Sequence, residues 1–258
     1  MTAVRWLVSD SLTALDRNLR GVRSSPDLLS VVTIQPVMFV VLFVFVFGGA
    51  INTPGLDYVD FLMPGILIQT IVFGSSLTTI GLASDMTKGI IDRFRSLPMA
   101  KPAVLVGRTL ADGAMNAFAA VVMIAVGLLV GFDFKTGVLD VIAGIGLMLL
   151  VGFAFSWVAA VVGLALRSVE AAQTAGFLWL FPLTFASSAF VPVESMPAAI
   201  EAFAQVNPIT LAVDALRHLF VGTPAGNAVW GTVVWCVGLL VVFVPLAVAR
   251  YGRVFERA

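Results

Sequence analysis

Charged residues are scarce in this sequence. Only 12% of its 258 residues are Asp, Glu, Lys or Arg, and 60% are apolar, against about 25% and roughly 45–50% in ordinary soluble domains. This composition excludes a soluble globular fold, an intrinsically disordered chain and a fibrous repeat. The 15 basic residues are balanced by 15 acidic ones, so no surplus of positive charge is available to neutralise phosphates. We therefore expect no nucleic-acid partner.

Residues that carry enzyme chemistry are also few. The single cysteine, Cys236, excludes an intrachain disulfide and a cysteine metal cluster, and the single histidine, His218, has no second metal ligand beside it. No glycine is followed directly by lysine, so the glycine-rich loop that cradles nucleotide phosphates is absent. We therefore expect a protein that is not an enzyme, holds no metal or cofactor itself and does not hydrolyse ATP.

Six charge-free windows are long enough to cross a bilayer core of about 30 Å as helices. They lie within residues 28–56, 61–84, 113–132, 141–166, 171–193 and 228–249. No window shows the alternation of lipid-facing barrel strands, and a helix satisfies its own backbone hydrogen bonds in lipid. We predict an all-α polytopic membrane protein with six transmembrane helices, forming a single transmembrane domain over residues 1–258.

The distribution of basic residues predicts the orientation of the chain. All but two of the 15 Lys and Arg residues lie in the N-terminal leader, around the connections after the second and fourth windows, or in the C-terminal tail; the exceptions are Lys135 and Arg217. Basic flanks are retained on the cytoplasmic side. We therefore expect a multi-pass protein of the cell inner (plasma) membrane with both termini in the cytoplasm.

The N-terminal leader, residues 1–27, has the pattern of an amphipathic helix. Its aliphatic residues recur every three or four positions, and Arg17 and Arg20 fall on the opposite face. Arginine can reach lipid phosphates from a helix in the interface, so we expect an elbow helix that contacts membrane lipid. Packing against the protein's own loops is the alternative.

Two connections outside the windows are also informative. Residues 86–98 place Ile90, Phe94 and Leu97 on one helical face. Such a helix suits docking into a partner's pocket, because a buried ring and flanking arginines supply contact area and charged hydrogen bonds; charges that only fix the topology are the alternative. Residues 194–227 are apolar and contain three prolines, which favours a partly re-entrant extracytoplasmic segment.

Three short motifs follow one another on this layout. Phe61-Leu62-Met63-Pro64-Gly65-Ile66-Leu67 opens the second window, Gly89 and Arg93-Phe94-Arg95-Ser96-Leu97-Pro98 follow it, and Asn207-Pro208-Ile209-Thr210 precedes Arg217. With them the sequence resembles the permeases of type-2 ABC exporters, particularly the daunorubicin-resistance-like branch of bacterial drug and polyketide exporters. The resemblance covers nearly the whole chain and is more specific for the family than for any substrate.

The resemblance implies a half-transporter, the membrane subunit of an ATP-driven exporter. Two such permeases, as a homodimer or a paralogous heterodimer, would pair with two copies of a separate ABC ATP-binding subunit, which binds ATP and Mg²⁺. The implied cargo is an amphipathic drug, secondary metabolite or lipid moved out of a bacterial cell. Two alternatives stay open: an ion-coupled secondary carrier or channel, which the charge-free windows disfavour, and a non-transporting membrane scaffold for a cytoplasmic partner.

The resemblance also implies roles for individual residues. A coupling helix over residues 86–98 would contact the ATP-binding subunit through Lys88, Ile90, Asp92, Arg93, Phe94, Arg95 and Leu97. Arg17 and Arg20 of the elbow would assist, and Asp85 stands where many relatives carry a glutamate. The substrate pathway would be lined by Gln69, Phe73, Gln173, Phe177 and Phe181, although rings that only face lipid are the alternative. An extracytoplasmic gate would contain Asn207, Pro208, Thr210, Asp214 and Arg217.

Asp214 also has a simple structural role available. Arg217 and His218 follow it by about one helical turn, so Asp214 can pair with either of them.

Overall fold

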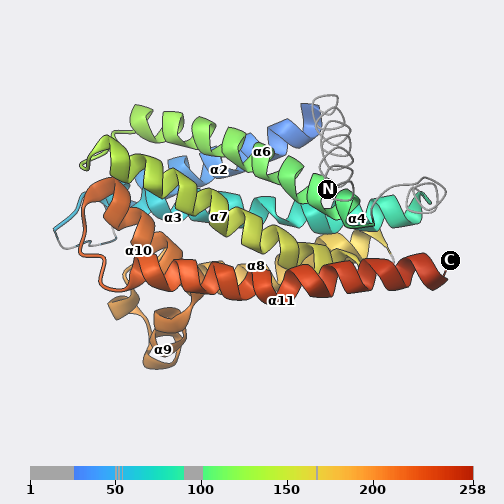
Figure 1. The fold of residues 1–258 in the computed structure, drawn as a ribbon. Helices are drawn as coiled ribbons and strands as arrows, with labels where there is room; N and C mark the ends of the chain where they lie inside the picture. Colours follow the sequence, from blue (N-terminus) through green and yellow to red (C-terminus); the bar gives the residue numbers. More distant parts are fainter. Residues whose placement is uncertain are drawn as a thin grey trace.

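The structure, a computed structural model, is a bundle of helices that lie lengthwise beside one another (Figure 1). It describes residues 26–49, 51, 53, 55–89, 101–166 and 168–257. Every regular element within these residues is a helix. The predicted all-α class is therefore confirmed for this part of the chain.

The helices follow one another with short connections. In order they are α2 (Pro26–Leu42), η1 (Phe43–Phe47), α3 (Tyr58–Gly74), α4 (Ser76–Thr87), α6 (Lys101–Leu129), α7 (Val138–Gly163), α8 (Val169–Phe185), η2 (Val193–Ser195), α9 (Ala198–Val206), α10 (Pro208–Val221) and α11 (Ala228–Arg257). Each of the six windows predicted from the sequence overlaps one helix or two consecutive ones.

Four helical stretches are long and apolar enough to cross a membrane. They are Tyr58–Thr87, Val104–Leu129, Val138–Gly163 and Ala228–Arg253. The other two windows coincide with shorter helices: an apolar stretch at the end of α2 and in η1, and α8, which has 17 residues. The described part of the chain thus has several apolar helices suited to a multi-pass membrane protein, and the full count of six spans stays a prediction.

α3 lies at the centre of the bundle. Almost all of its residues are buried, from Tyr58 to Val72, and it contacts α6, α7, α8 and α10. A helix that is apolar on every side is a core or membrane helix, which explains why this run of aliphatic residues is enclosed by other helices. The closest approach occurs at Gly65, where a Cβ atom would lie 2.0 Å from the carbonyl oxygen of Ala189.

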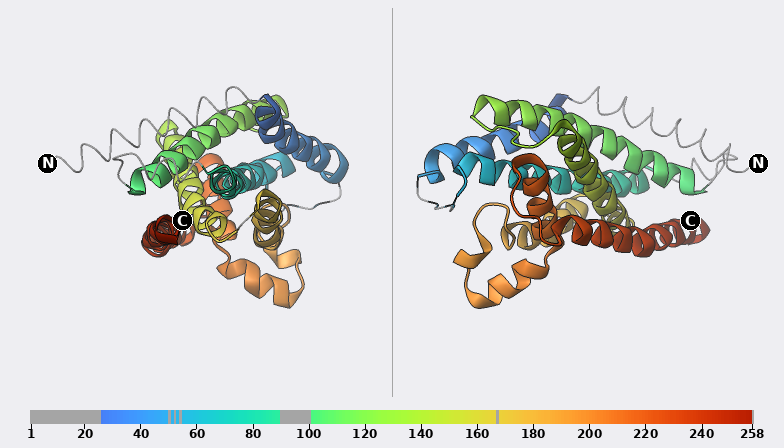
Figure 2. Two further views of the ribbon diagram at one scale, coloured as in Figure 1. Left: turned by 90° about the vertical axis from the view of Figure 1, so that its right-hand side faces the viewer. Right: turned by 60° about the vertical axis from the view of Figure 1, so that its left-hand side comes forward.

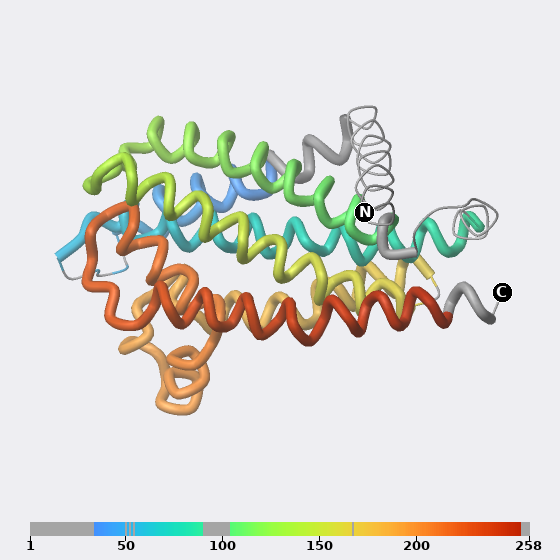
Figure 3. The backbone as a smooth tube through the Cα atoms, viewed as in Figure 1, coloured from blue at the N-terminus to red at the C-terminus, as the bar shows by residue number. Residues whose placement is uncertain are grey.

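α4 continues α3 along the bundle (Figure 3), and the two helices are separated by a break at Ser75. The hydroxyls of Ser75 and Ser76 each donate a hydrogen bond to the carbonyl three residues earlier, at 2.6 Å. α4 packs against α7 and α8 and ends at Thr87. Gly89 has a φ of +63°, a conformation that favours glycine and is typical of helix ends.

The two ends of the bundle carry different elements. The end of α4 and the C-terminal end of α11 lie at one end, which we call the α4 end, and α10 lies at the other, the α10 end (Figure 1). Lys88 follows α4, and Arg253 belongs to α11, so both lie at the α4 end. Arg217 belongs to α10, and the backbone N–H of Lys135 donates to the carbonyl of Phe220, so these two basic residues lie at the opposite end.

Two helices occupy the segment 194–227. α9 projects from the side of the bundle (Figure 2) and exposes Ile200, Phe203 and Val206. α10, by contrast, is buried against α3, α7 and α11. The depth at which these two helices lie in a membrane stays a prediction.

One helix begins well before the window drawn from the sequence. The third window begins after Asp112, but α6 begins at Lys101, and its candidate span Val104–Leu129 includes both Arg108 and Asp112. Charged residues were taken as limits of spans, whereas charged side chains that pair with each other can lie inside one. The depth at which Arg108 and Asp112 lie in a membrane stays a prediction.

Candidate functional site

Asn207 fixes the start of α10. Its side-chain oxygen accepts a hydrogen bond from the N–H of Ile209 at 2.9 Å, and Pro208 takes the first helical position, where a missing N–H costs little. Its side-chain nitrogen donates to the carbonyls of Leu183 and Ala186 at 2.6 and 2.8 Å. One side chain thus caps α10 and satisfies carbonyl groups at the end of α8.

Arg217 is buried in α10, with 5% of its surface exposed, and uses all three guanidinium nitrogens. Nε donates to the carbonyl of Phe61 at 2.9 Å, Nη1 to Asp214 Oδ1 at 2.8 Å, and Nη2 to the carbonyl of Ser188. The guanidinium carbon also lies 3.7 Å from the centre of the Phe61 ring, which is a cation–π contact. Arg217 therefore joins α10 to α3 and to the connection that follows α8.

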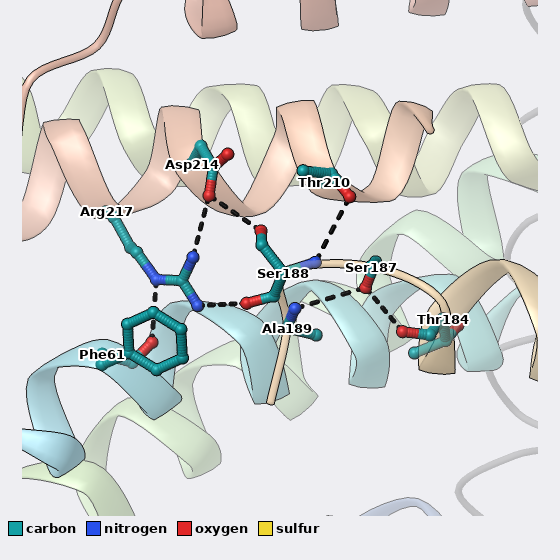
Figure 4. Close-up of polar contacts among 8 residues, drawn as sticks. All are labelled: Phe61, Thr184, Ser187, Ser188, Ala189, Thr210, Asp214 and Arg217. Atoms are coloured by element: carbon teal, nitrogen blue, oxygen red, sulfur yellow. Dashed lines mark hydrogen bonds and ion pairs between the residues drawn. The ribbon is translucent and has the colours of Figure 1, made fainter. Parts of the chain in front are cut away.

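Ser188 completes this arrangement (Figure 4). Its hydroxyl donates to the same Asp214 oxygen at 2.8 Å, and its N–H donates to Thr210 Oγ1 at 3.2 Å. The arrangement is named the Arg217 cluster below and consists of Phe61, Ser188, Thr210, Asp214 and Arg217. Because most of its polar atoms bond to one another, it is a rigid joint between three parts of the chain.

The structure therefore brings the predicted gate residues close together around the connection after α8. Of the two partners predicted for Asp214, the structure selects Arg217; His218 Nδ1 instead lies 2.5 Å from the carbonyl oxygen of Thr223. Sequence reasoning missed the contacts of Ser188 and Phe61 with Arg217, because these residues lie 29 and 156 positions away from it in the sequence and part of each contact goes through a backbone carbonyl. The role of these residues in a gate stays a prediction.

A cavity of about 620 Å³ lies beside the Arg217 cluster at the α10 end. Phe61, Asp214 and Arg217 line it, together with Glu194 of η2 and Asn227, which directly precedes α11. The side chain of Asp214 keeps 40% of its surface exposed, whereas that of Arg217 keeps 6%. In the cavity the carboxylate of Asp214 is therefore more accessible than the guanidinium of Arg217.

Phenylalanine rings form a continuous row along α8. The ring of Phe73 in α3 lies 5.8 Å from that of Phe177 and 5.5 Å from that of Phe181. Phe181 stacks on Phe185 at 5.2 Å, and Phe185 stacks on Phe190 at 5.1 Å. Aromatic rings at such distances attract one another beyond the burial of their area.

The row continues to the first apolar helix. Phe43 of η1 stacks on Phe190 at 4.6 Å and contacts Phe39 and Phe47 at 6.0 and 5.3 Å. The phenylalanine row comprises Phe39, Phe43, Phe47, Phe73, Phe177, Phe181, Phe185 and Phe190. Five of these rings were not predicted, because the row joins helices that are far apart in the sequence; only the four-residue spacing after Phe181 pointed to Phe185.

The two glutamines predicted for the pathway lie in different surroundings. Gln173 is exposed, four and eight residues before Phe177 and Phe181, and so lies on the same face of α8. Gln69 is buried in α3 with 6% of its surface exposed. The structure thus brings Phe73, Phe177 and Phe181 together and aligns Gln173 with them, while Gln69 lies in the core.

Known proteins match this chain over most of its length. Residues 11–221 match the ABC-2 type transporter family. The chain belongs to this family. The permease is 35% identical to the daunorubicin resistance ABC transporter permease protein DrrB1 of Streptomyces coeruleorubidus, over 95% of this chain and 86% of that protein. It is 27% identical to the probable doxorubicin resistance ABC transporter permease protein DrrC of Mycobacterium tuberculosis, over 95% of this chain and 90% of the relative.

A more distant relative is the putative transport permease ycf38 of Cyanophora paradoxa, which is 22% identical over 72% of this chain and 66% of that protein. The family predicted from the sequence motifs is thus confirmed. The similarity to drug-resistance permeases also agrees with the predicted function, a permease subunit of an ABC exporter.

Of the coupling residues predicted for the permease, the structure describes one. Lys88 is exposed directly after the last residue of α4. The others, Ile90, Asp92, Arg93, Phe94, Arg95 and Leu97, lie outside the described residues, as do Arg17 and Arg20 of the predicted elbow helix.

Two ion pairs of the permease escaped sequence reasoning. At the α10 end Lys135 pairs with Asp60, and this hydrogen bond and charge raise the pKa of the Lys135 ammonium. In α6 Arg108 Nε lies 3.9 Å from Asp112 Oδ1. The four-residue spacing of Arg108 and Asp112 is the pattern of a helical ion pair, and that spacing was the available signal.

Proposed function

We propose that this ABC-2 permease moves an amphipathic organic molecule, a drug, secondary metabolite or lipid, out of the cell, and that a separate ATP-binding subunit supplies the energy. The observation that carries the proposal is the similarity, over 95% of the chain, to permeases named for daunorubicin and doxorubicin resistance. The phenylalanine row supports the cargo class, because apolar aromatic walls with few polar groups suit amphipathic molecules.

The proposed assembly contains two permeases, identical or paralogous, and two ATP-binding subunits that hold ATP and Mg²⁺. Each permease would have six spans in the plasma membrane of a bacterial cell, an interfacial elbow over residues 1–27, a re-entrant segment over residues 194–227 and both termini in the cytoplasm. Lys88 and Arg253 at the α4 end support this orientation, because basic flanks favour the cytoplasmic side.

The coupling helix is the part of the permease that the ATP-binding subunit is proposed to contact. Replacement of Arg93 by Glu together with Phe94→Ala reverses a charge and removes a ring at this contact. We expect proteoliposomes with the ATP-binding subunit to lose ATP-dependent transport of daunorubicin, used as the probe, and the ATP-binding subunit to co-purify less well. Arg253→Ala, an exposed charge on α11, is the matched control. Unchanged transport in the double variant would contradict the coupling assignment.

The pathway assignment needs its own test. Phe181 and Leu178 are both exposed on α8, at 45% and 74%, but only Phe181 belongs to the phenylalanine row. Phe181→Ala is expected to reduce daunorubicin transport, while Leu178→Ala is expected to leave it near the wild-type rate. Equal effects of the two substitutions would indicate that both side chains face lipid.

A further inference from the structure

The permease contains a buried polar contact between α4 and α6 that its proposed function has not used. Asp112 of α6 is 6% exposed and accepts a hydrogen bond from the buried hydroxyl of Thr78 in α4. Arg108, one turn earlier in α6, donates through Nη2 to the carbonyl of Leu77 at 2.8 Å. A charged pair inside an apolar span is costly to retain, which makes it a candidate for a functional role.

Gly81 of α4 completes the contact. A Cβ atom at this position would lie 1.6 Å from Arg108 Nη2, so the guanidinium rests directly on the glycine. The face of α4 toward α6 therefore offers a hydroxyl that bonds to Asp112, and a carbonyl and a glycine surface that receive the Arg108 guanidinium.

The contact lies just beyond the break at Ser75. Asn116, one turn after Asp112 in α6, lies against this break: a Cβ on Gly74 would come 2.3 Å from its Oδ1. Its Nδ2 is buried and bonds to no other group in the described part of the chain. A buried donor without an acceptor is unfavourable. The arrangement around the break therefore leaves the Asn116 amide unsatisfied.

α4 also touches the helix that carries the phenylalanine row. It packs against α8, where a Cβ on Gly176 would lie 3.3 Å from Ser76 Cβ. α4 is also bonded to α7, where the hydroxyl of Thr79 in α4 donates to the carbonyl of Ala159 at 3.0 Å. A movement of α4 about Ser75 therefore acts on α8 next to Phe177.

We propose that Arg108 and Asp112 are positioning residues for transport. They hold α4 to α6, so that force applied to the connection beyond Gly89 turns α4 as one rigid piece and shifts α8. This inference rests on the proposed function, because it assumes that the ATP-binding subunit acts on that connection. Neither residue touches the cargo.

Two pairs of substitutions test the proposal. Thr78→Val removes the hydroxyl at nearly constant volume, and Thr78→Ser keeps it. Gly81→Ala displaces the Arg108 guanidinium without changing any charge, and Gly113→Ala, beside Asp112 in α6, adds the same methyl where no atom of the described residues lies within 4 Å. In each pair the first variant should release α4 from α6 and the second should not.

The first measurement is the amount of daunorubicin moved per ATP hydrolysed by the reconstituted complex. Loss of a charged hydrogen bond shifts a two-state population by about tenfold or more, so we expect Thr78→Val and Gly81→Ala to lower this ratio by about that factor. Thr78→Ser and Gly113→Ala should keep it. A merely structural role would reduce the amount of folded complex and leave the ratio unchanged, and that result would overturn the proposal.

The second measurement needs no ATP-binding subunit. In the permease alone, amide hydrogen exchange over residues 76–87 should be faster in Thr78→Val and Gly81→Ala than in their controls, while α3 stays protected. Equal exchange in all four variants would overturn the proposal even if transport is altered. A wild-type complex that hydrolyses ATP but moves no cargo would contradict the proposed function instead, and the exchange result would still decide whether Arg108 and Asp112 hold α4 to α6.

Discussion

Arg217→Ala is the substitution that probes the joint at the α10 end most directly. It deletes three donated hydrogen bonds and the cation–π contact with Phe61, and it leaves the carbonyls of Phe61 and Ser188 without the donor that Arg217 supplies. The carboxylate of Asp214 loses Arg217 as its partner too, but it keeps the hydrogen bond from the Ser188 hydroxyl, and water reaches its exposed side. The cost therefore falls mainly on the Ser188 carbonyl and on the space left by the guanidinium, because the Phe61 carbonyl lies inside α3 and keeps its helical hydrogen bond.

The size of the effect follows from the burial of this side chain. A buried carbonyl left without its donor costs about 1–3 kcal/mol, and the lost cation–π contact about 0.5–2 kcal/mol, so the substitution should cost about 2–5 kcal/mol. Each kcal/mol lowers the melting temperature by roughly 2–4 °C in a domain of this length, so we expect a decrease of about 4–20 °C. Arg217→Lys keeps the charge but cannot bond to three acceptors at once, and it should lose roughly half as much.

The assay is thermal unfolding of the purified permease in detergent, followed by tryptophan fluorescence. Arg253→Ala is the control, because Arg253 is exposed on α11 and surface substitutions usually change stability by no more than about 0.5 kcal/mol. If Arg217→Ala melts within about 2 °C of the wild type, the Arg217 cluster does not hold α10 in place.

Two further predictions concern backbone contacts. Gly65→Ala should strongly destabilise the permease, because the new methyl would meet the carbonyl of Ala189, whereas Gly146→Ala, which no other group in the described part of the chain approaches within 4 Å, should be neutral in the same melting assay. Asn207→Ala should cost about 1 kcal/mol for the lost cap and more for the two carbonyls that it leaves without a donor. Asn207→Asp keeps the cap oxygen but not the donor, so in the same assay it should recover only part of the loss; full recovery would show that the two carbonyl contacts contribute nothing.

The helices could be placed from the sequence because a lipid environment leaves few choices. A long apolar run without charge must form a helix to satisfy its backbone, and this reasoning located α7, and α3 and α4 as one continuous helix, within a few residues. The end of α8 could not be placed. The fifth window runs to residue 193, but α8 ends at Phe185, where Asn207 of a later helix takes the carbonyls of Leu183 and Ala186.

Most of the polar contacts could not be predicted from the sequence either. Asp214 and Arg217 are three residues apart on one helix, so their pairing could be foreseen, but the carbonyls of Phe61 and Ser188 carry no sequence signal. Arg108 and Asp112 were taken as the edge of a span because their partners on α4 lie about thirty residues earlier. Contacts made through backbone atoms or between distant helices became visible only in the structure.

The central claim is that this permease moves its cargo only when a separate ATP-binding subunit hydrolyses ATP. It is tested most directly by measuring daunorubicin accumulation in proteoliposomes that contain the purified permease, with and without that subunit. We predict no accumulation by the permease alone under an imposed proton or sodium gradient, and ATP-dependent accumulation once the subunit and Mg-ATP are added. Gradient-driven accumulation by the permease alone would contradict the claim and establish an ion-coupled carrier instead.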